Sequence, residues 1–132
     1  MYPIAQLINA ALEPTSTNGR TWNVNERLPR TNILEGEKDY RLEMDLPGVR
    51  NQDLDISVED GTLTVKAERS LEVPEGYSSR RCEMNGKMSW RRSFQLGSAV
   101  ESEKIGARLE NGILTVTLPK SEKSLPRRIE VE

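Results

Sequence analysis

The dipeptide Asn111-Gly112 constrains the fold of this chain more than any other feature of its sequence. Apolar and polar residues alternate on both sides of it, at Leu109 before the pair and through residues 114–118 after it. A two-residue hairpin turn needs a positive φ at both positions, which Gly adopts freely and Asn at small cost. The stretch therefore predicts two antiparallel strands, the second of which ends at Pro119 because proline cannot donate to a ladder.

Similar patterns recur through the middle of the chain and predict further strands. They fall at residues 31–35, 40–46, 54–58, 62–68, 90–96 and 104–109. Asp60-Gly61 is a second hairpin turn between two of these stretches. Apolar side chains at every second position are typical of antiparallel strands buried on one face. With 132 residues, the chain has the length of a single domain, and we expect an all-β sandwich or small barrel.

The two ends of the chain differ from this middle part. Within residues 1–12 the apolar side chains recur with helical spacing, at Ile4, Leu7, Ile8 and Leu12. This spacing predicts an amphipathic helix, which is either a core helix of the domain or an arm that contacts other subunits or clients. Residues 13–29 are rich in Asn, Thr, Ser, Pro and Gly and are predicted to be a linker. We therefore divide the chain into an arm at 1–29, a β-domain at 30–120 and an extension at 121–132.

Two features inside the β-domain need an explanation. Residues 69–88 show no clear pattern, and so long a loop in a compact domain is usually functional. Alternatively it holds a strand, at residues 79–83, that pairs outside its own sheet. Arg92 falls on the apolar face of its strand, where a guanidinium is costly unless paired. It either extends to water at the rim of the sheet or forms a structural ion pair, within the chain or across a subunit boundary.

Composition excludes several classes of function. The chain has no histidine and one cysteine, Cys82, so the most common general base, the usual zinc ligands and any intrachain disulfide are missing. The formal net charge is −2 without a basic block, which argues against nucleic acid as a partner. We see neither a secretory signal nor a membrane-spanning run, and expect a reducing, cytoplasmic location.

Four motifs, in their order along the chain, resemble those of the small heat shock proteins and their α-crystallin domain. The first is Ala107-x-x-x-Asn111-Gly112-Ile113-Leu114, and the second is Asp45-Leu46-Pro47-Gly48 with the alternating hairpin that follows it. The third is Trp90-x-Arg92-x-Phe94-x-Leu96, with Trp in place of the family's first Phe, and the fourth is Ile129-x-Val131 near the end. Two departures are Gly97, where many members have proline, and the short N-terminal arm. Together the motifs cover residues 30–120 and the extension.

The resemblance implies an immunoglobulin-like β-sandwich and an ATP-independent holdase, a chaperone that prevents aggregation of partly unfolded proteins. It implies homo-oligomers built from dimers, with Ile129 and Val131 inserted into an apolar groove of a neighbouring subunit. The family places this groove between two strands, which implies these six residues: Leu54, Ile56, Val58, Ile105, Ala107 and Leu109. It also implies that the long loop pairs with the partner subunit, so that the dimer interface includes Arg92, Arg80, Arg81, Cys82 and Glu83. The arm residues Ile4, Leu7, Ile8 and Leu12 are our candidates for client contact.

Three alternatives remain open at the level of sequence. A sandwich of similar fold could instead be an adaptor or co-chaperone domain that binds a folded partner. An enzyme could use the acidic residues Asp53, Asp55, Glu59 and Asp60, but alternation places them on an outer face and in a turn, where a solvated surface is the simpler explanation. Residues 129–131 could be no more than a frayed tail. We expect no catalytic site, no cofactor, no metal, no nucleic-acid partner and no membrane insertion.

Overall fold

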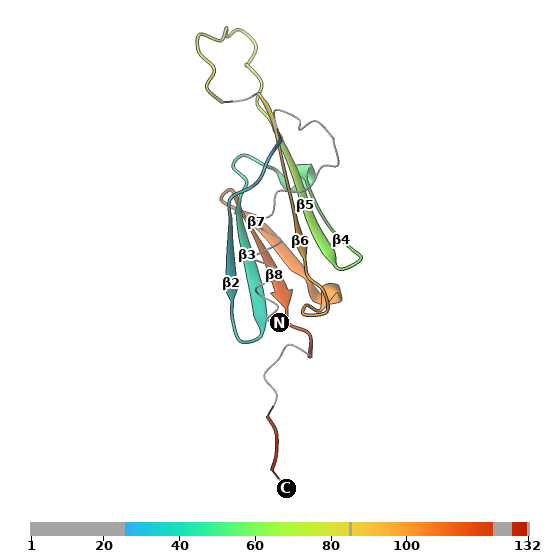
Figure 1. Ribbon diagram of the computed structural model, residues 1–132. Helices are drawn as coiled ribbons and strands as arrows, with labels where there is room; N and C mark the ends of the chain where they lie inside the picture. Colours follow the sequence, from blue (N-terminus) through green and yellow to red (C-terminus); the bar gives the residue numbers. More distant parts are fainter. Residues whose placement is uncertain (1–25, 85, 123–127, 132) are drawn as a thin grey trace.

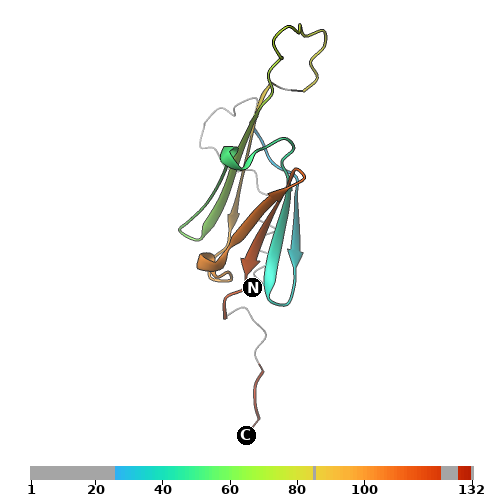
Figure 2. The ribbon, with the colours of Figure 1, turned by 180° about the vertical axis from the view of Figure 1, so that it is seen from behind.

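Two four-stranded β-sheets pack face to face in the computed structural model, which describes residues 26–84, 86–122 and 128–131 (Figure 1). The first sheet has the order β1-β6-β5-β4 and the second the order β2-β3-β8-β7. The strands are β1 (Glu26–Arg27), β2 (Thr31–Glu35), β3 (Asp39–Asp45), β4 (Leu54–Glu59), β5 (Thr62–Ser70), β6 (Lys87–Gln95), β7 (Gly106–Glu110) and β8 (Ile113–Pro119), with short 3-10 helices η1 (Asn51–Asp53) and η2 (Ser102–Lys104). The view from behind shows the same two layers (Figure 2). The predicted β-sandwich is confirmed.

Both predicted hairpin turns have the backbone conformation that their residues suggested. Asn111 and Gly112 have φ values of 53° and 76°, and Asp60 and Gly61 have values of 51° and 74°. The flanking residues pair directly, Glu110 with Ile113 in one hairpin and Glu59 with Thr62 in the other. These are two-residue turns with positive φ at both positions, whose twist matches that of the flanking strands.

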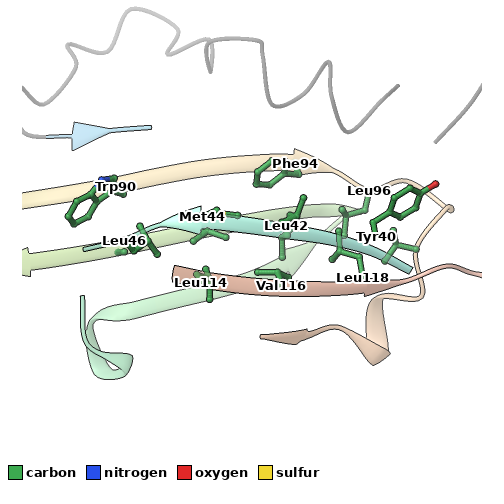
Figure 3. Packing of buried hydrophobic residues seen from close by; sticks show 14 of the residues in the cluster. Tyr40, Leu42, Met44, Leu46, Trp90, Phe94, Leu96, Leu114, Val116 and Leu118 are labelled. Carbon is green, nitrogen blue, oxygen red and sulfur yellow. The ribbon is translucent and has the colours of Figure 1, made fainter. Parts of the chain in front are cut away.

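The core lies between the sheets and is built from the inward residues of the alternating stretches. Figure 3 shows Tyr40, Leu42 and Met44 of β3 packed between β8 and β6. The register pairs Leu42 with Val116 and Met44 with Leu114, so neighbouring strands place their apolar residues side by side. The buried hydrophobic residues are Tyr40, Leu42, Met44, Leu46, Val49, Leu63, Val65, Ala67, Trp90, Phe94, Leu96, Ala99, Val100, Leu114, Val116 and Leu118.

The structure differs from the sequence predictions at a few element boundaries. β7 begins at Gly106 rather than at 104, because residues 102–104 form η2. Residues 79–83 are not a strand in the single chain, and their pairing with a partner subunit stays a prediction, because one chain does not test it. The predicted N-terminal helix and most of the linker lie outside the described residues.

Candidate functional site: an open groove, an extended arm and an exposed tail

The two sides of the sandwich differ in how their strand edges are covered. On one side the chain passes from β1 in the first sheet to β2 in the second, and residues 28–30 connect the two layers. On the other side the edge strands are β4 and β7, which belong to different sheets and are not hydrogen-bonded to each other. Among the described residues, no strand pairs with the outer edge of β4 or of β7, and we call the hollowed surface between these two strands the groove.

A hollow of about 330 Å³ lies in this groove. The residues that line it are Asn51, Leu54, Ala107, Arg108, Leu109 and Leu114. Leu54 and Leu109 are half-buried on the two edge strands and pack against the core, while Leu114 is fully buried beneath them. The hollow is therefore lined by four apolar residues together with the polar residues Asn51 and Arg108.

The hollow exists because Ala107 has a short side chain at an edge position. Ala107 pairs with Val116, so its side chain points to the same face of the sheet as the core residues of β8. It nevertheless remains exposed, since β7 is an edge strand among the described residues. A larger residue here would fill the space that a docked side chain would occupy.

The six residues expected to form the groove all lie on or beside its two edge strands. Leu54, Ala107 and Leu109 line the hollow itself. Ile56 and Ile105 are half-buried and pack against the core, and Val58 is exposed near the end of β4. Asn51, Arg108 and Leu114 also line the hollow and were not anticipated. Leu114 could have been found from its register opposite Leu109.

The tail residues Ile129 and Val131 are 82% and 96% exposed. The domain ends at a fixed point before them, because Ser121 donates from its backbone N–H to Ala99 (2.9 Å) and from its hydroxyl to the carbonyl oxygen of Ser98 (2.6 Å). Figures 1 and 2 show residues 128–131 away from the sandwich, beyond the end at which β8 finishes. Two large apolar side chains are therefore exposed to solvent, with the exposed Glu130 between them in the sequence.

Arg92 connects β6 of the first sheet to the segment that leads into β2 of the second sheet, on the side of the sandwich opposite the groove. Its Nη1 donates to the carbonyl oxygen of Pro29 at 2.8 Å and to the hydroxyl of Thr31 at 3.1 Å. The guanidinium also lies 5.7 Å from the centre of the Phe94 ring. Burial lowers the pKa of Arg92 from its ordinary value. The sequence predicted the inward position, and the structure gives it an intrachain role; its place in a dimer interface stays a prediction.

A long arm, whose described residues are 71–84 and 86, leaves the sandwich between β5 and β6. At its root Leu71 donates a backbone hydrogen bond to Gly86, and beyond that pair the arm extends away from both sheets (Figure 1). The predicted interface residues Arg80, Arg81, Cys82 and Glu83 are all exposed on it. Arg81 and Glu83 form an ion pair at 3.1 Å, and the Cys82 thiol lies 2.8 Å from the Ser79 hydroxyl. Arg92, by contrast, contacts Pro29 and Thr31 at the sandwich itself.

The acidic residues Asp53, Asp55, Glu59 and Asp60 are spread over both ends of β4 and the turn after it. Asp53 pairs with Arg50 at 2.9 Å, and Asp55, Glu59 and Asp60 are exposed. Among the described residues, no group of three His, Cys, Asp or Glu side chains is arranged to hold a metal ion. No helix within that part of the chain has the length and hydropathy to cross a membrane.

Comparisons with known proteins agree with this geometry. The profile of the Hsp20/alpha crystallin family matches residues 32–132. Small heat shock protein C2 of Rickettsia felis is 36% identical over 105 residues, which cover 80% of this chain and 68% of that protein. For small heat shock protein C4 of the same organism, the match is 35% identical and spans 63% of its length. Heat shock protein 16 of Schizosaccharomyces pombe is 33% identical over 110 residues.

Solved structures show the same architecture. Heat shock protein 16.0 from Schizosaccharomyces pombe has a TM-score of 0.64 at 31% identity, covering 80% of this chain and 99% of that one. A small heat-shock protein from Xylella fastidiosa, described as having a distinct high order structure, has a TM-score of 0.64 at 31% identity. That match covers 80% of this chain and 97% of the Xylella chain. The two facing sheets described above are thus a known arrangement.

Proposed function

Since the chain belongs to the Hsp20/alpha crystallin family, we propose that it is an ATP-independent holdase that binds partly unfolded proteins and prevents their aggregation. The observation that carries the proposal is the pairing of an open apolar groove with an exposed apolar tail in one chain. A tail that docks in the groove of another copy covers apolar surface, and its release exposes that surface to a client. Binding of the client then follows mass action, without nucleotide hydrolysis.

The assembly that we propose is a homo-oligomer built from dimers. The arm at residues 71–86 supplies exposed backbone and the side chains of Leu71, Val73, Tyr77 and Met84, all exposed in the single chain. β2 is an edge strand, hydrogen-bonded to β3 alone within the described residues, so its free side can accept a strand from a second copy. Dimer contacts of Arg80, Arg81, Cys82, Glu83 and Arg92 belong to this proposal, as do client contacts of Ile4, Leu7, Ile8 and Leu12.

A direct test is an aggregation assay with a heat-labile client, monitored by light scattering in the absence of ATP. We expect the chain to suppress scattering in proportion to its concentration, and an equal mass of serum albumin to have no such effect. Added ATP should change nothing. Unaltered client aggregation in the presence of excess chain would exclude the holdase.

The alternative is an adaptor or co-chaperone domain that binds one folded partner. It would need neither the exposed tail nor the open groove, and it would be a monomer in solution. Sedimentation velocity separates the two, because the holdase that we propose is larger than a dimer. The proposal includes no catalytic residue, cofactor or nucleic acid, and it places the chain in the cytoplasm, where the exposed Cys82 stays reduced.

A further inference from the structure

Arg69 is the one buried charged residue among the described residues, and the proposed function does not use it. It follows Leu63, Val65 and Ala67 as the next inward position of β5 and is 8% exposed. No carboxylate of the described residues pairs with it, and its Nε is buried without a hydrogen-bond partner. An apolar residue would avoid this desolvation cost, so the guanidinium must contribute something that a hydrocarbon cannot.

Its contacts connect the root of the arm to the opposite sheet. Nη1 donates to the carbonyl oxygen of Pro47 at 3.2 Å, in the turn that follows β3 of the second sheet. Nη2 lies 4.0 Å from Sδ of Met88, and the guanidinium is 5.5 Å from the centre of the Trp90 ring, both on β6 of the first sheet. Arg69 therefore links the two sheets at the end of the sandwich from which the arm leaves (Figure 1).

Gly48 leaves room for this contact. A Cβ at Gly48 would lie 2.7 Å from Cδ of Arg69, closer than real Cβ atoms approach other heavy atoms. The φ of Gly48 is +77°, and that of Gly112 is +76°, but the nearest atom to a Cβ at Gly112 is 3.6 Å away. The two glycines thus share one backbone conformation, but only at Gly48 would a Cβ collide with the aliphatic part of an arginine side chain.

We propose that Arg69 is the positioning residue of the arm: through Pro47 it fixes the direction in which residues 71–86 leave the sandwich, and so prepares the arm to pair with a second copy. Beyond Arg69 the β5–β6 ribbon has no opposite sheet, and Leu71 and Val73 are already exposed. A two-stranded ribbon without such support twists more strongly than a wider sheet and is only marginally stable on its own, so its direction is not held by the two strands alone. The importance of the direction rests on the proposed function, in which the arm forms the dimer.

The test measures the direction of the arm itself. One nitroxide is attached to Cys82 in the arm and another to a cysteine introduced by Glu59→Cys on the exposed end of β4, in full-length chains diluted with unlabelled chains. We expect a narrow distance distribution for the parent and for Arg91→Met, the matched control on the exposed face of β6. Arg69→Met should broaden it at least twofold, and Arg69→Lys, which keeps a cation able to reach Pro47, should narrow it again. A parental width for Arg69→Met would overturn the proposal even if its Tm fell.

The glycine pair supplies a second test. Gly48→Ala displaces the Arg69 side chain and should broaden the distribution as Arg69→Met does, whereas Gly112→Ala carries the same backbone strain and should leave it narrow. Equal widths for the two glycine variants would contradict the proposal.

The proposed dimer is tested separately by Ser79→Pro, which removes a backbone donor from the arm. If this variant dimerises like the parent, the arm is not the dimer contact and that part of the proposed function fails. The widths of the nitroxide distance distributions still decide whether Arg69 sets the direction of the arm.

Discussion

Docking of the tail can be tested by removing its two apolar side chains together. Ile129→Ala deletes three carbons and Val131→Ala deletes two, from side chains that are 82% and 96% exposed in the single chain. At about 0.8 kcal/mol per buried methylene, full burial of the exposed parts in the groove would contribute about 2 kcal/mol from Ile129 and about 1.5 kcal/mol from Val131. The double substitution therefore weakens each tail contact by up to about 3.5 kcal/mol, or roughly 400-fold in the dissociation constant.

Sedimentation velocity over a series of concentrations measures this effect. The double variant should begin to dissociate toward dimers at a protein concentration roughly two orders of magnitude above that at which the parent dissociates, given the size of the lost contact. Glu130→Ala is the matched control, because alternation directs its side chain away from the face that Ile129 and Val131 share. It should assemble like the parent.

A substitution in the groove tests tail docking independently of the tail. Ala107→Leu fills the hollow of about 330 Å³ from the side of β7 and should reproduce the dissociation without any change in the tail. Parental assembly of the double tail variant at every concentration would refute tail docking. Parental assembly of Ala107→Leu alone would instead place the docking site away from this hollow.

Three further predictions concern the stability of the sandwich. Phe94→Ala removes a fully buried ring and should lower the free energy of unfolding in urea by about 3–5 kcal/mol, and a loss under about 1 kcal/mol would show that the site is not close-packed. Arg92→Met removes the charged donor from the carbonyl of Pro29, which keeps the Thr31 hydroxyl as a donor, and should lower the free energy of unfolding by about 1–3 kcal/mol, with faster amide exchange in residues 26–35; unchanged exchange there would argue against a link from Arg92 to this segment. Burial, and then the carboxylate of Glu35, raise the pKa of Tyr40 above 10.0 in the folded chain, so the unfolded chain loses this proton first. The stabilisation from the protonated Tyr40 is therefore complete below pH 10 and is lost as the pH rises further. Tyr40→Phe should show a smaller fall in the free energy of unfolding between neutral and alkaline pH, and the same fall in both chains would contradict this.

The elements that sequence predicted well are those determined by local pattern. Alternation at residues 40–46 gave the buried face of β3, and the Asn111-Gly112 and Asp60-Gly61 pairs gave both hairpins with their φ signs. Each of these depends on neighbours within a few positions of the chain. The family motifs then supplied the pairing of the sheets, which a single sequence does not contain.

The features that sequence missed depend on what lies opposite a residue in space. Arg92 was placed on the inner face correctly, but its acceptor on Pro29 is 63 positions away and comes from the segment considered a linker. The predicted strand was ended at Glu68, one position before Arg69, so the inward arginine was not recognised. Ala107 was expected at a groove only through the family resemblance, because a groove there depends on the position of β7 at a sheet edge, and alternation within one strand does not reveal strand order.

The arrangement of edges explains how one small domain can serve two kinds of contact in the assembly that we propose. The groove between β4 and β7 lies on one side of the sandwich, and the free edge of β2 lies on the other. A docked tail and a paired arm therefore do not compete for the same surface. Exchange of arms between two copies is reciprocal and closes at a dimer, whereas a tail in a neighbour's groove is a heterologous contact that leaves a free tail and a free groove for further copies. The arm thus sets the building block and the tail sets how far the assembly grows, which is why loss of the tail contacts should leave dimers rather than monomers.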